Sequence, residues 1–126
     1  MIEEYIDNVN DSYYNYCDSV SDFCSSLPTT SKILTRMCIY INDLMLVSGE
    51  SIEESFQNLK KFKTTFKHNS EVIEETMLDI MERHNLDDLQ LKINDVADKK
   101  QAVLDSITDA WNFCYAKTAK LLNRDF

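Results

Sequence analysis

The chain has 126 residues, of which 44% are hydrophobic and 28% charged, and this composition predicts one folded domain spanning residues 1–126. It contains one glycine, which excludes the P-loop and the dinucleotide fingerprint because each requires more than one. A formal net charge of −9 opposes direct binding to nucleic acid or to an anionic membrane and favours a basic partner.

The first segment, residues 2–27, predicts a helix because its apolar residues recur at alternating steps of four and three. This heptad spacing lines up one apolar seam along the helix. The seam consists of Ile2, Ile6, Val9, Tyr13, Tyr16, Val20, Phe23 and Leu27. Pro28 is expected to end the helix, because proline disfavours helical dihedral angles in the residue before it.

The middle of the chain predicts three further helices. Residues 29–48 are apolar on most sides, which is typical of a buried helix, and Gly49 would end that helix as a left-handed residue. Ser51 and Glu54 have the spacing of a capping box and open the next helix. Residues 68–70, with the sequence His-Asn-Ser, predict a break, and the serine would cap a fourth helix.

The last segment, residues 85–123, keeps the four-three spacing and predicts a helix about 57 Å long. A break at residues 94–98 is the alternative, but the seam keeps its phase there, which favours continuity. Lys100 fills one slot of this seam. The sequence therefore predicts an all-α antiparallel bundle of four to five helices, with long, heptad-patterned first and last helices. We expect a second copy to cover the overhanging last helix, giving a homodimer.

The metal-ligating and nucleophilic side chains form no known motif. Those considered are Cys17, Cys24, Cys38, Cys114, His68 and His84. No pair has the close spacing of a zinc site, and both histidines fall near predicted helix ends, where their charge suits the helix dipole. There is no secretion signal and no apolar run of about 20 residues. We expect a soluble, cytoplasmic protein with reduced cysteines and no metal, cofactor, catalytic residue or membrane contact.

The acidic residues are segregated along the chain. Residues 1–27 carry six acidic and no basic side chains, and the carboxylates of the first helix lie mostly opposite its seam. They form an acidic strip that is either a solvated face or a docking surface for a basic partner. The candidate partner-binding residues are Glu4, Asp7, Asp11, Tyr14, Asp18, Asp22 and Trp111. For Trp111, which neighbours the seam of the last helix, core anchor is the favoured role and interface anchor the alternative.

A basic cluster lies in the third predicted helix. Lys60, Lys63 and Lys67 share one face of that helix and are either solvated or meet the acidic strip of a neighbouring subunit.

We recognise no family in this sequence, and three functional hypotheses compete. The first is a non-enzymatic protein–protein interaction module, an adaptor or inhibitor that works through helical faces and the acidic strip. The second is an acidic nucleic-acid mimic that blocks a nucleic-acid-handling protein. The third is an enzyme or metalloprotein whose site is assembled only in three dimensions. Few Gly and Pro with frequent Asn, Tyr, Ile and Asp is typical of AT-rich genomes such as those of phages or viruses, and favours an inhibitor acting in a host cytoplasm.

Overall fold

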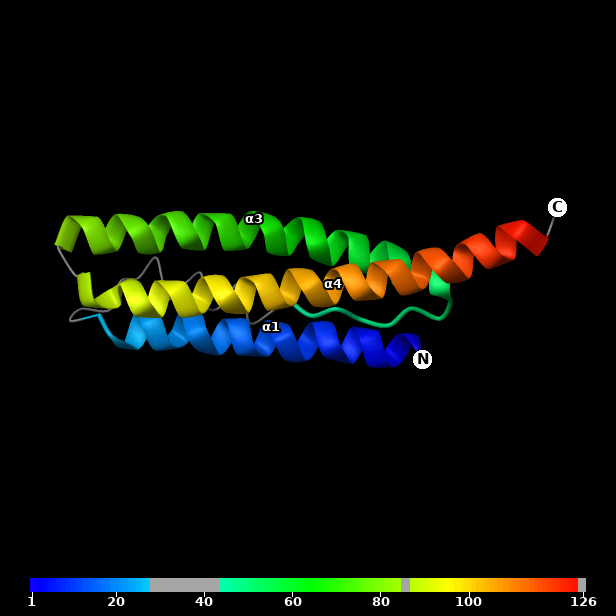
Figure 1. The fold of residues 1–126 in the computed structure, drawn as a ribbon, viewed down its shortest axis with the longest axis horizontal. Helices are drawn as coiled ribbons and strands as arrows, with labels where there is room; N and C mark the ends of the chain where they lie inside the picture. The colour runs from blue at the N-terminus through cyan, green and yellow to red at the C-terminus, as the bar shows by residue number, and fades with distance from the viewer. Residues whose placement is uncertain (28–43, 85–86, 125–126) are drawn as a thin grey trace.

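The computed structural model of the protein describes residues 1–27, 44–84 and 87–124. These residues form three α-helices, α1 (Ile2–Ser25), α3 (Ile52–His84) and α4 (Gln90–Arg124), and the short 3₁₀ helix η1 (Asp87–Leu89), without a strand among them. Helices α1 and α3 run in the same direction, and α4 returns antiparallel to both (Figure 1). The predicted all-α class is confirmed, and the described elements make an elongated bundle.

One apolar cluster runs through the bundle and takes residues from all three helices. Six residues of the predicted α1 seam are buried, and the two terminal ones are partly buried: Ile6, Val9, Tyr13, Tyr16, Val20 and Phe23, with Ile2 and Leu27 at the ends. Rings of α1 and α3 meet at the centre of this core. Phe66 lies 5.2 Å from Tyr16 and 6.0 Å from Tyr13, measured between ring centroids, and both contacts are edge-to-face.

The break predicted at residues 68–70 is wrong, because α3 is one helix of 33 residues. Ser70 does not cap a new helix: it is buried, and its hydroxyl donates to the carbonyl oxygen of Lys67 at 3.0 Å within the same helix. Phe66, Ile73 and Met77 are buried on either side of it. Burying this continuous apolar stripe outweighs the weak local preference of His, Asn and Ser for a helix end.

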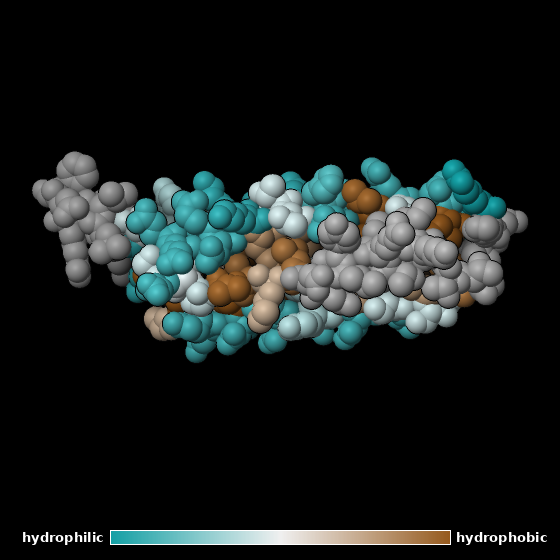
Figure 2. Space-filling model, turned by 180° about the vertical axis from the view of Figure 1, so that it is seen from behind, coloured by the Kyte–Doolittle hydropathy of each residue, from teal (hydrophilic) through white to brown (hydrophobic). Residues whose placement is uncertain are grey.

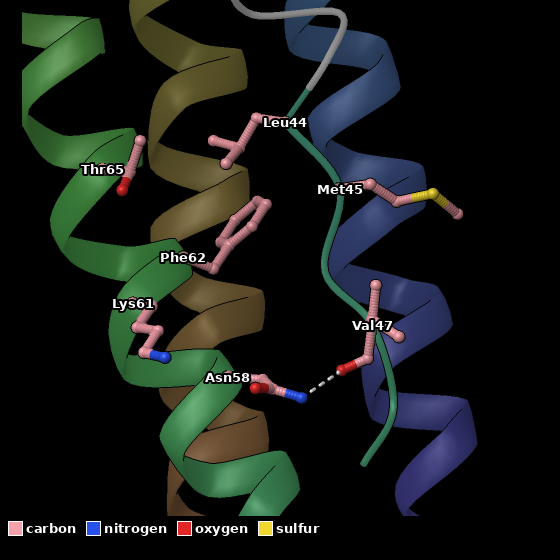
Figure 3. A pocket seen from close by; sticks show the side chains of 7 residues that line it. All are labelled: Leu44, Met45, Val47, Asn58, Lys61, Phe62 and Thr65. Atoms are coloured by element: carbon pink, nitrogen blue, oxygen red, sulfur yellow. Dashed lines mark hydrogen bonds between the residues drawn. The ribbon is translucent and has the colours of Figure 1, made fainter.

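Most of the helix predicted over residues 29–48 lies outside the described residues, and its described end is not helical. Residues 44–50, here called the strap, cross between α1 and α3 without regular secondary structure (Figure 3). The side-chain amide of Asn10 makes two hydrogen bonds with the backbone of buried Leu46. It donates to the carbonyl oxygen at 2.9 Å and accepts from the N–H at 3.1 Å. Asn58 of α3 donates to the carbonyl oxygen of Val47 at 3.1 Å. Side-chain amides therefore satisfy backbone groups of the strap that a helix would have paired internally.

Gly49 does not have the predicted role of a left-handed residue at a helix end, because its φ lies outside that region. A Cβ atom at this position would lie 2.6 Å from Cβ of Glu54 and 2.7 Å from the backbone nitrogen of Ser55. The strap therefore needs glycine for its close approach to the first turn of α3. The predicted capping box is half formed: Ser51 accepts from the N–H of Glu54 at 3.1 Å, but the Glu54 carboxylate accepts from the N–H of Glu50.

Replacing Gly49 with alanine is expected to lower the free energy of unfolding by about 1–3 kcal/mol, because the strap must move away from the α3 backbone. Urea denaturation followed by circular dichroism measures this change. Ser48→Ala, at an exposed neighbouring position, is the control and should have an effect below about 0.5 kcal/mol. Equal midpoints for Gly49→Ala and the unchanged protein would contradict this account of the glycine.

Helix α4 is continuous over 35 residues, about 52 Å at 1.5 Å per residue, as favoured from the sequence. It packs against both α1 and α3, and its C-terminal end extends beyond them (Figure 1). Lys100, which interrupts the predicted seam, is half-buried and pairs with Glu74 of α3 at 3.2 Å. None of the described helices combines the length and apolarity needed to cross a membrane.

Candidate functional site

The acidic strip lies on the outer side of α1, opposite the buried seam. All five of its carboxylates are exposed, and α1 contains no lysine or arginine: Glu4, Asp7, Asp11, Asp18 and Asp22. Tyr14 is 54% exposed beside them, as expected for a contact residue. The helical geometry thus holds the carboxylates in one row along roughly 27 Å of helix.

An ion pair lies at each end of α1. Asp22 accepts from the Lys92 ammonium of α4 at 2.9 Å, so one carboxylate of the strip is already engaged within the fold. At the other end, the amino group of Met1 bonds the Glu3 carboxylate at 2.8 Å. That hydrogen bond, a backbone hydrogen bond and the nearby positive charge hold the pKa of Glu3 below its ordinary value of 4.5.

Four carboxylates of the strip have no ion pair with any cation that the structure describes: Glu4, Asp7, Asp11 and Asp18. Grouping like charges on one helix face costs repulsion that a basic partner would relieve. The exposed part of the strip is therefore a surface of concentrated negative charge.

Trp111, predicted as a core anchor or alternatively as an interface anchor, packs against α3. Its ring lies 4.4 Å from Phe56 of α3, centroid to centroid, and the Lys63 ammonium lies 5.4 Å above it. The indole is half-buried at the boundary between α3 and α4. The structure thus separates two surfaces, and the aromatic pair belongs to the basic one.

The pairing of Phe56 with Trp111 could not be found from periodicity, which assigns each ring to a helix face without saying which faces meet. The sequence does indicate the basic surface itself, because Lys60, Lys63 and Lys67 of the third predicted helix are spaced by three and four residues. That spacing places them on one side of α3, and the tryptophan of α4 lies against the same side.

A hollow of about 220 Å³ lies between the strap and α3 (Figure 3). Leu44 points toward Phe62 there, and Lys61 and Thr65 complete the wall from α3. Seen from behind, hydrophobic residues reach the surface in the middle of the molecule, with hydrophilic residues above and below them (Figure 2). The hollow brings together apolar groups but no cluster of chemically reactive ones.

Among residues 1–27, 44–84 and 87–124, no three His, Cys, Asp or Glu side chains are grouped so that they could hold a metal ion. Cys17 and Cys114 are buried and Cys24 is half-buried. Burial raises the pKa of the Cys114 thiol above its ordinary value of 9.0, so this thiol stays protonated at neutral pH.

Comparison with protein-family models, with curated proteins and with solved structures finds no match to this chain. The two charged surfaces described above are therefore the features of this molecule that bear on its function.

Proposed function

We propose that this protein is a non-enzymatic interaction module that binds a basic protein through the acidic strip of α1. The observation that carries the proposal is the row of carboxylates without described cation partners, Glu4, Asp7, Asp11 and Asp18. Complementary charge accelerates the encounter with a basic surface and makes the affinity depend on salt. Tyr14 supplies an exposed aromatic contact within the same row.

The second candidate function is that the acidic strip imitates nucleic acid. It is less well supported, because the strip carries fewer charges per length than duplex DNA. The strip carries five carboxylates over 18 residue steps, about 27 Å of helix. Duplex DNA carries one charge per roughly 1.7 Å, or about 16 charges over the same length. A basic protein surface needs no such density, so an ordinary protein partner fits the strip better than a groove built for phosphates.

The proposal includes the finer features predicted from the sequence. They are left-handed heptad packing, a cytoplasmic location, an adaptor or inhibitor role in a phage or virus, and a homodimer. The homodimer is supported by the C-terminal end of α4, which extends past α1 and α3 (Figure 1). Tyr115 of α4 is 65% exposed and offers apolar area to a second copy.

The proposal is tested with two triple variants that change the net charge equally, from −9 to −6. One replaces Asp7, Asp11 and Asp18 of the strip with asparagine. The matched control replaces three exposed aspartates of α4: Asp95, Asp98 and Asp109. Proteins captured from the source cell by the unchanged chain and identified by mass spectrometry provide the partner for quantitative binding.

The strip variant is expected to bind at least about tenfold more weakly, and the α4 control to bind within about twofold of the unchanged protein. Binding of the unchanged protein should also weaken as salt rises from 50 to 300 mM on the order of tenfold. Equal losses in the two variants would mean that net charge alone drives binding. Displacement of the partner by a DNA oligonucleotide would favour the mimic instead.

A further inference from the structure

The first half of α3 forms a basic face, defined by Lys60, Lys63 and Lys67, which contrasts with the acidic chain around it. The 16 residues from 55 to 70 contain four lysines and one histidine but no aspartate or glutamate. All three lysines are exposed, and they line one hollow of about 490 Å³ together with Trp111 of α4. Thr64, His68 and one carboxylate, that of Glu71, complete its wall. A positive surface of this kind is unusual in a chain with a net charge of −9.

No carboxylate among the described residues pairs with the basic face. The lysine and arginine ion pairs found there are Arg83–Asp79, Lys92–Asp22 and Lys100–Glu74. Lys60 and Lys63 instead lie over aromatic rings, 5.9 Å from the centre of Phe56 and 5.4 Å from that of Trp111. These cation–π contacts fix the ammonium groups beside apolar surface without neutralising them. The basic face therefore keeps its charge for a ligand.

The neighbouring charges limit the length of that ligand. Glu53 and Glu54 precede the basic face on α3, and Glu71 and Glu74 follow it. Lys60 to Lys67 covers seven residue steps, about 10.5 Å. A long polyanion such as a nucleic acid would extend from the lysines onto these carboxylates and be repelled, whereas a short acidic segment would fit between them.

The spacing of the lysines matches that of an α-helix. Steps of three and four residues place charges about 4.5 and 6 Å apart along the helix axis. Carboxylates at the same steps on a partner helix have the same separations, so three can face three lysines together. The half-buried rings of Phe56 and Trp111 add an apolar area beside them. The charge, length and lysine spacing of the basic face thus all fit a short acidic α-helix.

We propose that the basic face of α3 binds an acidic α-helix of a partner protein, with three carboxylates spaced by three and four residues and an apolar side chain against Phe56 and Trp111. This surface is independent of the acidic strip and has the opposite charge. Two such surfaces on one bundle make the protein an adaptor that joins a basic partner to an acidic one.

The experiment uses the full chain and a synthetic helical peptide with three glutamates at these steps and one leucine beside them. Trp111 is the only tryptophan, so its fluorescence reports binding at the basic face directly. The control peptide has glutamine in place of glutamate. We expect the glutamate peptide to bind about tenfold more tightly than the glutamine peptide, and the difference to shrink in high salt.

Two protein variants locate the binding. The double variant Lys63→Gln with Lys67→Gln should weaken binding of the glutamate peptide about tenfold. Lys61→Gln removes one positive charge and is the control for position, since Lys61 lies on the same helix but lines the hollow beside the strap (Figure 3), and it should change binding less than about twofold. Circular dichroism spectra that coincide with that of the unchanged protein show that the variants are folded.

Equal affinity for the glutamate and glutamine peptides would overturn the proposal, as would equal losses in the Lys61 and the double variant. Three kinds of result therefore count against it, of which these peptide measurements are the first. The second is tighter binding of a single-stranded oligonucleotide than of the peptide through the same lysines, which would assign the face to nucleic acid. The third is sedimentation showing self-association that the double variant abolishes, which would assign it to a second copy. The peptide and oligonucleotide measurements do not involve the aspartates of the acidic strip, so their failure leaves the proposal for the strip standing.

Discussion

Phe66→Ala is expected to lower the free energy of unfolding by about 3–5 kcal/mol, the usual effect of truncating a buried phenylalanine. Phe66 is 1% exposed, and its ring contacts Tyr13 and Tyr16 of α1 as well as Phe62 of α3. Removing it leaves a cavity where α1 meets α3, and also removes three aromatic contacts. Because a small domain is stable by only about 5–15 kcal/mol, much of the total stability is lost.

Urea denaturation followed by circular dichroism measures the effect of Phe66→Ala. Phe66→Leu keeps most of the volume and should cost less than half as much, since the remaining cavity is smaller. Tyr14→Ala removes a ring of similar size from an exposed position and should change stability by less than about 0.5 kcal/mol. A loss below about 1 kcal/mol for Phe66→Ala would mean that this ring is not in the core.

Asn10→Ala is expected to lower the free energy of unfolding by about 2–4 kcal/mol. The substitution removes both hydrogen bonds to the backbone of Leu46, a residue that is 2% exposed. The N–H and the carbonyl oxygen of Leu46 would then lose these partners while the residue stays buried. Each buried polar group left without a partner costs roughly 1–3 kcal/mol. The strap would separate from α1 to let water reach these groups, which limits the total.

Amide hydrogen exchange distinguishes loss of the strap from global unfolding. Exchange at Leu46 should accelerate at least about tenfold in Asn10→Ala while amides in the middle of α3 remain protected. Asn58→Ala is the control, because it removes one exposed hydrogen bond to Val47 and should cost about 1 kcal/mol or less. If the two variants lose the same stability, the paired bonds of Asn10 have no special role in holding the strap.

The helical class and the buried side of each helix were predictable because both depend on local spacing. The seam residues of α1 are buried or partly buried, and the seam of α4 keeps its phase through residues 94–98. Apolar residues at steps of three and four select one side of a helix whatever it packs against. The exposure of the acidic strip follows from the same spacing, since its carboxylates lie on the opposite side of α1.

The errors arose where the outcome depends on packing between distant segments. The His-Asn-Ser sequence at residues 68–70 favours a helix end locally, but buried Ile73 and Phe66 on the same stripe keep α3 continuous. Likewise, no local pattern in the sequence indicates that the ring of Trp111 meets Phe56. Helix propensity is worth a few tenths of a kcal/mol per residue, and burial of large side chains exceeds it several-fold.

The sequence by itself determined that this protein is helical, which sides of its first and last helices are buried, and that its carboxylates and lysines are segregated. Only the tertiary structure decided that residues 44–48 form part of a strap, although they are as apolar as a buried helix. The hydrogen bonds of Asn10 and the close approach of Gly49 to α3 hold that conformation. An apolar segment needs burial and backbone partners, and which conformation supplies both depends on the space that the neighbouring helices leave.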